Sequence, residues 1–144
     1  MTCTFFGHKD YIKDVKPILK STLIDLIENK NINCFLVGNN GFFDSTVISI
    51  LSKLQEEYTH ISFYVVLAYM PSNSTYFENI SYKTILPEGI ESTPHKFAII
   101  YRNKWMLKKS DYVVSFVKRP FGGAARFYNM AIKQNKKVIN LADI

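Results

Sequence analysis

Short β-forming runs alternate with helical periods from one end of the sequence to the other. Five runs are predicted to be strands, at 2–6, 32–37, 61–67, 112–117 and 137–141. Between them, apolar residues recur every three or four positions, the spacing of a helix with one buried face. Because right-handed crossovers leave few other arrangements, this predicts an α/β fold with one doubly wound parallel sheet of five strands and helices on both faces. The expected strand order is 3-2-1-4-5, which places ligands at the carboxyl ends of the strands where the order reverses.

One segment interrupts this alternation. The length of 144 residues and the 47% of apolar residues suit a single domain covering 1–144. Within it, residues 68–93 are rich in Ser, Asn, Tyr and Pro and show no helix or strand period longer than a turn. Long loops in small domains usually act as lids or are disordered, and four aromatic residues argue against disorder here. We expect this loop to cover the ligand cleft without extending the sheet, with a dimer contact as the alternative; the aromatic residues are Tyr69, Tyr76, Phe77 and Tyr82.

The charges are distributed unevenly along the chain. Residues 94–144 hold eleven basic and two acidic residues, whereas residues 1–93 hold seven basic and ten acidic ones. The two parts therefore carry about +9 and −3. We expect an anionic ligand or partner to meet the C-terminal part.

Membrane and metal chemistry are not expected. No apolar run approaches the roughly 18–20 residues of a membrane-spanning helix, and residues 1–8 lack the basic lead and long apolar run of a signal peptide. We therefore expect a cytoplasmic protein. The two cysteines, Cys3 and Cys34, lie far from any His or Cys at metal-ligand spacing, so neither a metal site nor a cofactor is predicted.

The strongest local signal is a pair of glycines between a predicted strand and a predicted helix. Gly122 and Gly123 follow the run 112–117, and Arg126 lies close behind them. Glycines allow the backbone to approach a ligand, and the unpaired N–H groups of a first helical turn bind phosphate. The pair therefore indicates a phosphate site, although a tight turn whose glycines serve packing alone fits the same residues.

Two further strand ends have residues suited to binding. The residues Gly38, Asn39 and Asn40 follow the second predicted strand. The carboxylate of Asp44 can either accept hydrogen bonds from ribose hydroxyls or cap its own helix. Gly7 and His8 follow the first strand, where His8 either contacts a ligand or terminates the turn.

Several of these residues resemble a known family. The stretch Tyr101-Arg102-Asn103-Lys104-Trp105-Met106, the later Ser110-Asp111, the pair Gly122-Gly123 and the opening Phe6-Gly7-His8-Lys9 resemble the motifs of YpsA-like proteins of the SLOG superfamily. The resemblance covers most of the chain in order. It implies a Rossmann-like fold, a nucleotide or nucleotide-derived ligand and a homo-oligomer.

The same region is similar to the cytokinin-activating LOG enzymes of that superfamily, which cleave the N-glycosidic bond of a nucleoside monophosphate. The similarity implies that Arg102 falls on their catalytic arginine and Gly122-Gly123 on their paired glycines. The acids that follow the glycines in those enzymes are replaced here by Tyr128 and Asn129. If the chain is an enzyme, Glu88 or Glu91 is the candidate acid.

Three functions follow as hypotheses. The first is a domain that binds a nucleotide or nucleotide-derived ligand, with phosphate at the Gly-Gly helix start. The second is an N-glycoside hydrolase or transferase acting on a nucleoside monophosphate, and the third is a nucleic-acid binder that uses the basic C-terminal part. The candidate ligand-binding residues are Gly7, His8, Gly38, Asn39, Asn40, Asp44, Arg102, Gly122, Gly123 and Arg126.

Overall fold

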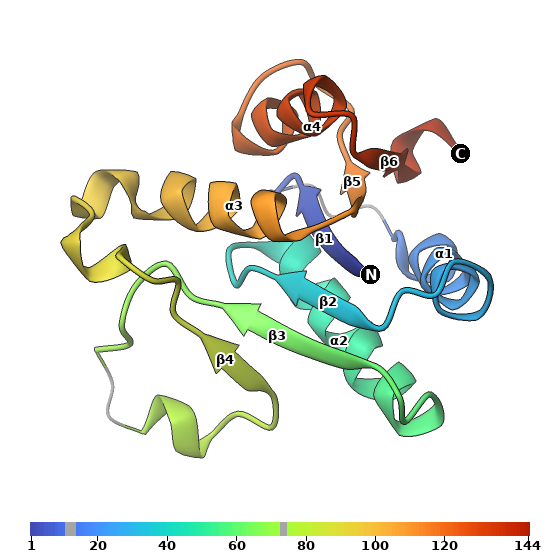
Figure 1. Ribbon diagram of the computed structural model, residues 1–144, viewed down its shortest axis with the longest axis horizontal. Coiled ribbons are helices and arrows are strands. Elements are labelled where there is room, and N and C mark those ends of the chain that lie inside the picture. Colours follow the sequence, from blue (N-terminus) through green and yellow to red (C-terminus); the bar gives the residue numbers. More distant parts are fainter. Residues whose placement is uncertain (11–13, 73–74) are drawn as a thin grey trace.

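A six-stranded, all-parallel sheet organises the protein (Figure 1). The computed structural model describes residues 1–10, 14–72 and 75–144. The sheet has the order β4-β3-β2-β1-β5-β6. Its strands are β1 (Thr2–Gly7), β2 (Cys34–Val37), β3 (Ser62–Val66), β4 (Lys83–Ile85), β5 (Tyr112–Phe116) and β6 (Lys137–Asn140).

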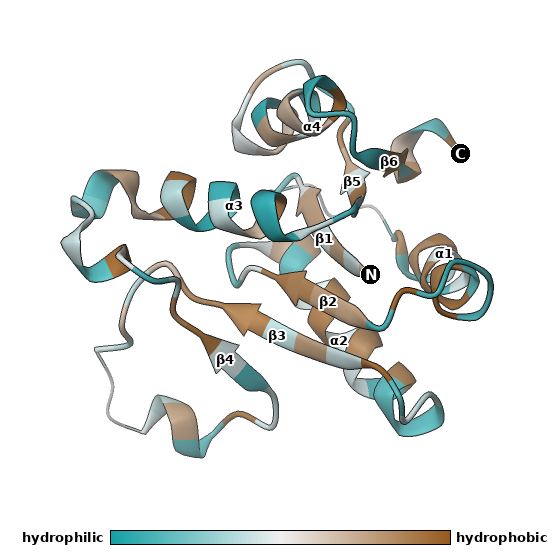
Figure 2. Cartoon of the chain, in the orientation of Figure 1, coloured by the Kyte–Doolittle hydropathy of each residue, from teal (hydrophilic) through white to brown (hydrophobic). Residues whose placement is uncertain are grey.

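Four helices cover the two faces of this sheet. On one face α1 (Lys16–Asn29) and α2 (Phe42–Glu57) pack through the larger apolar core, which includes Leu23 and Leu51. On the other face α3 (Ala98–Lys109) and α4 (Gly123–Lys133) pack through a second core around Met106 and Phe127. The inner strands are largely apolar (Figure 2), as expected for parallel strands covered on both sides. None of the helices in the described ranges is long and apolar enough to cross a membrane.

The predicted fold class and strand order are confirmed, and the strand count is corrected from five to six. β3, β2, β1, β5 and β6 occupy the predicted 3-2-1-4-5 order. The additional strand, β4, lies within the segment 68–93 and pairs in parallel with β3, Tyr64 opposite Lys83 and Val66 opposite Ile85. The expectation that this segment would not extend the sheet is therefore wrong.

The aromatic residues of the same segment are used within the fold. Tyr76 and Tyr82 pack against the larger core, with their hydroxyl oxygens 3.1 Å apart. Tyr69 stacks on His95, with ring centroids 4.2 Å apart. None of the described residues of 68–93 lines the cavity at the carboxyl ends of the strands, so the expected aromatic cover of a ligand cleft is not found there.

The order reverses beside β1, which lies between β2 and β5. In register, Gly7 at the end of β1 is opposite Phe116 at the end of β5, so both strands end at the same level. Their carboxyl ends and the starts of α2, α3 and α4 meet at one edge of the sheet. Doubly wound sheets bind ligands at such a switch point.

Candidate functional site

A cavity of about 300 Å³ lies at this switch point. This is at the lower end of the range for small-molecule sites. Its walls come from residues 5–9 at the end of β1, Asn40 and Asp44 at the start of α2, four residues of α3, and Arg119 with residues 122–124 at the start of α4. Four segments distant in sequence therefore meet around one space.

The start of α4 presents unpaired donors to the cavity. Gly122 is the N-cap residue, with φ of 96°, a backbone conformation that favours glycine, and Gly123 begins the helix. The carbonyl of Gly122 accepts the first hydrogen bond of the helix, from the N–H of Arg126. The N–H groups of residues 123–125 make no hydrogen bond within the described chain. A Cβ placed on Gly122 or Gly123 would meet no atom within 4 Å, so the space above these glycines is open.

Arg102 reaches the same cavity from α3. It is only 2% exposed, although it carries a charge. Its Nε donates to Asn103 Oδ1 (2.8 Å), and its Nη1 donates to the carbonyl of Val66 (2.9 Å) and to Asn39 Oδ1 (3.3 Å). Nη2 makes no hydrogen bond to any described residue. The arginine is thus held by two of its nitrogens and has a third available to an anion in the cavity.

Asp44 supplies a buried carboxylate beside this arginine. Its Oδ2 accepts a hydrogen bond from the N–H of Asn40 at 3.0 Å. Burial raises the pKa of the Asp44 carboxyl from 3.8 to about 6, although the Asn40 N–H and the positive charge of Arg102 both act in the opposite direction. The carboxyl is therefore mainly ionised at neutral pH and close to its titration range.

Gly38 makes this arrangement possible. A Cβ at this position would lie 2.9 Å from the Arg102 guanidinium carbon and 2.9 Å from Asp44 Oδ2. Gly7 has a comparable packing role, because a Cβ there would lie 2.3 Å from the ring of Phe43. Both glycines were predicted to approach a ligand; the structure gives each a contact with a side chain, and of the two only Gly7 lines the cavity.

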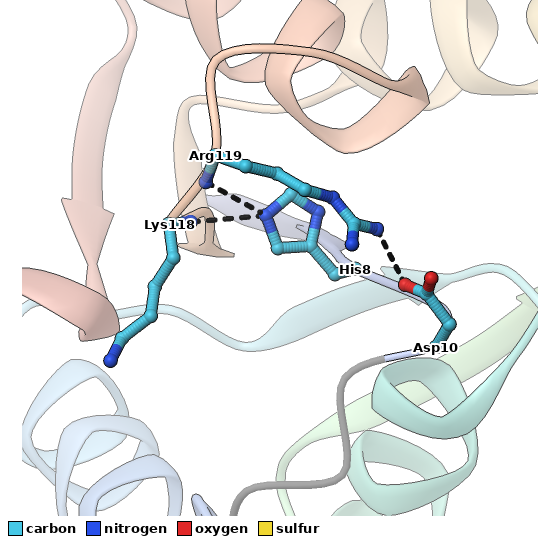
Figure 3. Close-up of polar contacts among 4 residues, drawn as sticks. All are labelled: His8, Asp10, Lys118 and Arg119. Carbon is cyan, nitrogen blue, oxygen red and sulfur yellow. Dashed lines mark hydrogen bonds and ion pairs between the residues drawn. The ribbon is translucent and has the colours of Figure 1, made fainter.

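His8 organises the loop that leads to α4 (Figure 3). The imidazole is 3% exposed, and its Nε2 accepts hydrogen bonds from the N–H groups of Lys118 (3.0 Å) and Arg119 (3.4 Å). Burial, with the nearby Arg119 charge, lowers the pKa of His8. An Nε2 that accepts must be unprotonated, so the ring is neutral and carries its proton on Nδ1. His8 therefore does more than terminate a turn: it holds the loop that precedes the glycine pair.

Arg119 lines the cavity, and Asp10, which does not line it, holds the Arg119 side chain. The Arg119 Nη2 donates to Asp10 Oδ1 in an ion pair (Figure 3). The Arg119 guanidinium also lies over the ring of Phe121, 5.4 Å from its centroid. Sequence reasoning did not assign a site role to Arg119 or to the apolar wall of Ile99 and Met106. The position of Arg119 three residues before Gly122 was the available signal.

The structure brings together most of the predicted ligand-binding residues. Those that line the cavity are Gly7, His8, Asn40, Asp44, Arg102, Gly122 and Gly123. Gly38 and Asn39 lie behind this wall, against Arg102.

Three other predicted residues lie outside the cavity. Arg126 is exposed on α4 with its guanidinium 5.8 Å from the ring centroid of Phe127, and it does not line the cavity. Glu88 and Glu91, the candidate catalytic acids, are exposed and absent from the cavity wall. The Glu88 carbonyl accepts a hydrogen bond from the Tyr101 hydroxyl. A metal cluster is not found in the described part of the chain, where no three His, Cys, Asp or Glu residues are grouped.

Comparison with known families identifies the domain. The model of the YpsA family, described as the YspA SLOG family, matches residues 2–142. The chain belongs to the SLOG family. The resemblance of the Arg102 stretch and the glycine pair to YpsA-like proteins is thereby confirmed. A search among curated proteins finds no match.

A solved structure shares the fold of this SLOG domain. The X-ray structure of DNA processing protein A (DprA) from Streptococcus pneumoniae superposes with a TM-score of 0.67 at 14% sequence identity. The similarity covers 95% of this chain and 48% of the DprA chain, so this domain spans about half of that protein. At this identity the likeness concerns the fold, which is the Rossmann-like α/β fold expected from the sequence.

Proposed function

We propose that this SLOG domain binds a nucleotide or nucleotide-derived ligand, with a phosphate held between the start of α4 and Arg102. One observation carries the proposal: Gly122, Gly123 and Ala124 at the start of α4 line the same cavity as the buried Arg102, whose Nη2 has no hydrogen bond to a described residue. Helix N-termini attract anions through these N–H groups and the helix dipole. A buried guanidinium adds a charge-assisted hydrogen bond.

The remaining walls suit the rest of a nucleotide. Asp44 offers an ionised carboxylate that can accept sugar hydroxyls. Ile99 and Met106 form an apolar wall against which a base can pack. The volume of about 300 Å³ favours a small ligand such as a mononucleotide.

Titration calorimetry with four related compounds tests the proposal. AMP and ribose 5-phosphate should bind, adenosine should bind much more weakly, and inorganic phosphate should compete with AMP. Gly123→Val should abolish the phosphate-dependent part of the affinity, because it fills the open space above the helix start. Arg126→Ala is the matched control, since Arg126 lies outside the cavity. Equal affinities for AMP and adenosine, or a loss with Arg126→Ala alone, would contradict the phosphate assignment.

A second candidate is hydrolysis of the N-glycosidic bond of a nucleoside monophosphate. The observation that favours it is the presence of Asp44 in the cavity, buried and with a pKa raised to about 6. A carboxyl group with such a pKa can exchange protons near neutral pH, as general acid–base catalysis requires. Glu88 and Glu91 no longer serve as candidates, because neither lines the cavity.

Chromatographic detection of free base separates the two candidates. A hydrolase releases adenine from AMP, and Asp44→Asn should stop that release while AMP still binds. If the wild-type protein binds AMP and releases no base, binding alone is the function supported.

A further inference from the structure

A second cavity lies between α1 and α2, away from the switch point of the sheet. Its volume is about 320 Å³, and none of the residues that line it belongs to the cavity beside the glycine pair. Its floor is apolar and comes from α2: Ile50 is 8% exposed and Leu54 is 2% exposed, so both form the base of a recess. Such a floor favours an apolar side chain as occupant.

Three lysines surround this floor. Lys16 and Lys20 come from α1 and Lys53 from α2, and all three are exposed. Within the described ranges, their ammonium groups make no ion pair or hydrogen bond. Glu57 is the one acidic residue that the described chain adds to the lining. The cavity is therefore positive, although residues 1–93 carry about −3 in total.

The stability of α1 does not account for these charges. Lys16 is the first residue of the helix, where a positive charge opposes the helix dipole. Lys20 lies four residues further on the same side, where two like charges repel each other. Both effects disfavour the helix, whereas a bound anion would be attracted by both lysines.

A smaller cavity adjoins the larger one at Lys16. It has a volume of about 170 Å³, and its walls include Lys16 with Phe42 and Thr46 at the start of α2. The Phe42 ring is 43% exposed and can bury further apolar surface against a partner. Asp14 also lines this cavity, but its Oδ1 already accepts the N–H of Lys16 at 3.1 Å. The two cavities together form a groove, which suits a chain segment with two apolar side chains.

We infer that this groove between α1 and α2 docks an acidic segment of a partner protein. One large apolar side chain enters the larger cavity, a second packs against Phe42, and carboxylates beside them meet the three lysines. Apolar anchors in pockets supply most of the affinity at such interfaces, and complementary charges around them supply selectivity. The inference is independent of the proposed nucleotide site, because the two sites share no residue.

Selection from a library of random peptides displayed on phage tests the inference. Peptides enriched on the wild-type protein should combine several carboxylates with two large apolar side chains. A fluorescein-labelled synthetic copy of the most enriched peptide should bind in fluorescence anisotropy. Its affinity should fall as the salt concentration rises, because salt screens charges on an exposed rim.

Two double variants provide the matched comparison. Lys16→Glu/Lys53→Glu reverses two charges in the groove, and Lys30→Glu/Lys83→Glu reverses two exposed charges outside it. The groove variant should weaken binding of the synthetic peptide about tenfold, since two attractions become repulsions. The control variant should bind within about twofold of the wild type, because salt screens distant charges.

Phe42→Ala tests the apolar contact without changing any charge. This variant should weaken peptide binding at least roughly threefold, because the exposed ring no longer contributes buried surface. Melting temperatures check that each variant is folded. Lys16→Glu places a negative charge at the start of α1, which suits the helix dipole. If the groove variant nevertheless fails to fold, Phe42→Ala alone decides.

The remaining outcomes contradict the inference. Enrichment of peptides without carboxylates, no enrichment at all, or equal losses in the two double variants would each overturn it. Sedimentation that shows a dimer dissociated only by the groove variant would mean that the groove holds a second copy of the chain. Binding to phosphatidylserine vesicles without any peptide binding would assign the lysines to a lipid surface, and the docking of an acidic segment would be wrong.

Discussion

The buried carboxyl of Asp44 should make the free energy of unfolding depend on pH in a specific way. In the unfolded chain its carboxyl titrates near 3.8, whereas burial raises the pKa to about 6 in the folded protein. Between these two pH values, the folded state therefore holds a proton that the unfolded state has released. Because stability falls with rising pH wherever the native state binds more protons, Asp44 costs stability as the pH rises from about 3.8 to about 6, and the cost is then constant.

The magnitude follows from the size of the shift. About two pKa units at 1.36 kcal/mol each give roughly 3 kcal/mol, of which about 2 kcal/mol develops between pH 4.5 and 7.5. Asp44→Asn keeps an oxygen that can accept the Asn40 N–H but cannot ionise. The free energy of unfolding of this variant, relative to wild type, should therefore increase by about 2 kcal/mol over that pH range.

Urea denaturation of both proteins at several pH values measures this difference. Taking the variant relative to wild type at each pH cancels the other titrating groups, which the two proteins share. Parallel pH profiles would show that Asp44 is not buried in the folded protein as described, and would also remove it as a candidate acid for hydrolysis.

Three further predictions concern other parts of the site. Gly38→Ala should cost about 1–3 kcal/mol of unfolding free energy, because its Cβ would displace Arg102 and Asp44. Gly123→Ala places its Cβ in open space, so its unfolding free energy should stay within about 0.5 kcal/mol of wild type. Equal losses of unfolding free energy in urea denaturation would contradict the packing around Gly38. Arg102→Ala should weaken AMP binding by about 1.5–3 kcal/mol in calorimetry and leave adenosine binding unchanged; a similar loss for adenosine would mean that Arg102 does not face the phosphate. The neutral His8 imidazole should carry its proton on Nδ1 and titrate below pH 6.5, since burial lowers its pKa. The stability that depends on neutral His8 is therefore present above pH 6.5 and lost as the pH falls through the folded-state pKa. Imidazole nitrogen NMR that shows a proton on Nε2 at neutral pH would refute this.

The sheet was predictable from sequence because its main strands are buried on both faces. Runs such as 61–67 and 112–117 are almost wholly apolar, and their alternation with helices leaves few topologies. β4 escaped prediction because it has only three residues, Lys83–Ile85, within a polar segment. Its strand conformation comes from pairing with β3, which is a tertiary contact that local sequence does not record.

The buried face of α3 differs from the one that its aromatic spacing indicates. Phe97, Tyr101 and Trp105 recur every four residues, but the buried residues of the helix are Ala98, Arg102, Met106 and Leu107. Phe97 belongs to a 3-10 turn before the helix, and the tighter winding of that turn shifts the phase of the period. A buried arginine also carries no apolar signal; its burial is possible because the Val66 carbonyl, Asn39 and Asn103 accept its hydrogen bonds.

At the start of α2, too, the sequence predicted the kind of contact but not the residue geometry. Asp44 was predicted as a possible N-cap residue, but Gly41, with φ of 99°, is the N-cap, and Asp44 is the third residue of the helix. From there its carboxylate accepts the Asn40 N–H and reaches the cavity. Residue type predicted a polar contact at this helix start, and the loop geometry decided which residue made it.

The phosphate site itself is tested most directly by the amide signals of residues 122–124 in ¹⁵N-labelled protein. Titration with AMP should shift the Gly123 and Ala124 amides strongly, because their unpaired N–H groups would donate to phosphate oxygens. Titration with adenosine should leave these two signals nearly in place. If AMP and adenosine shift them equally, or if AMP shifts only signals away from the start of α4, the phosphate does not bind there and the central claim is wrong.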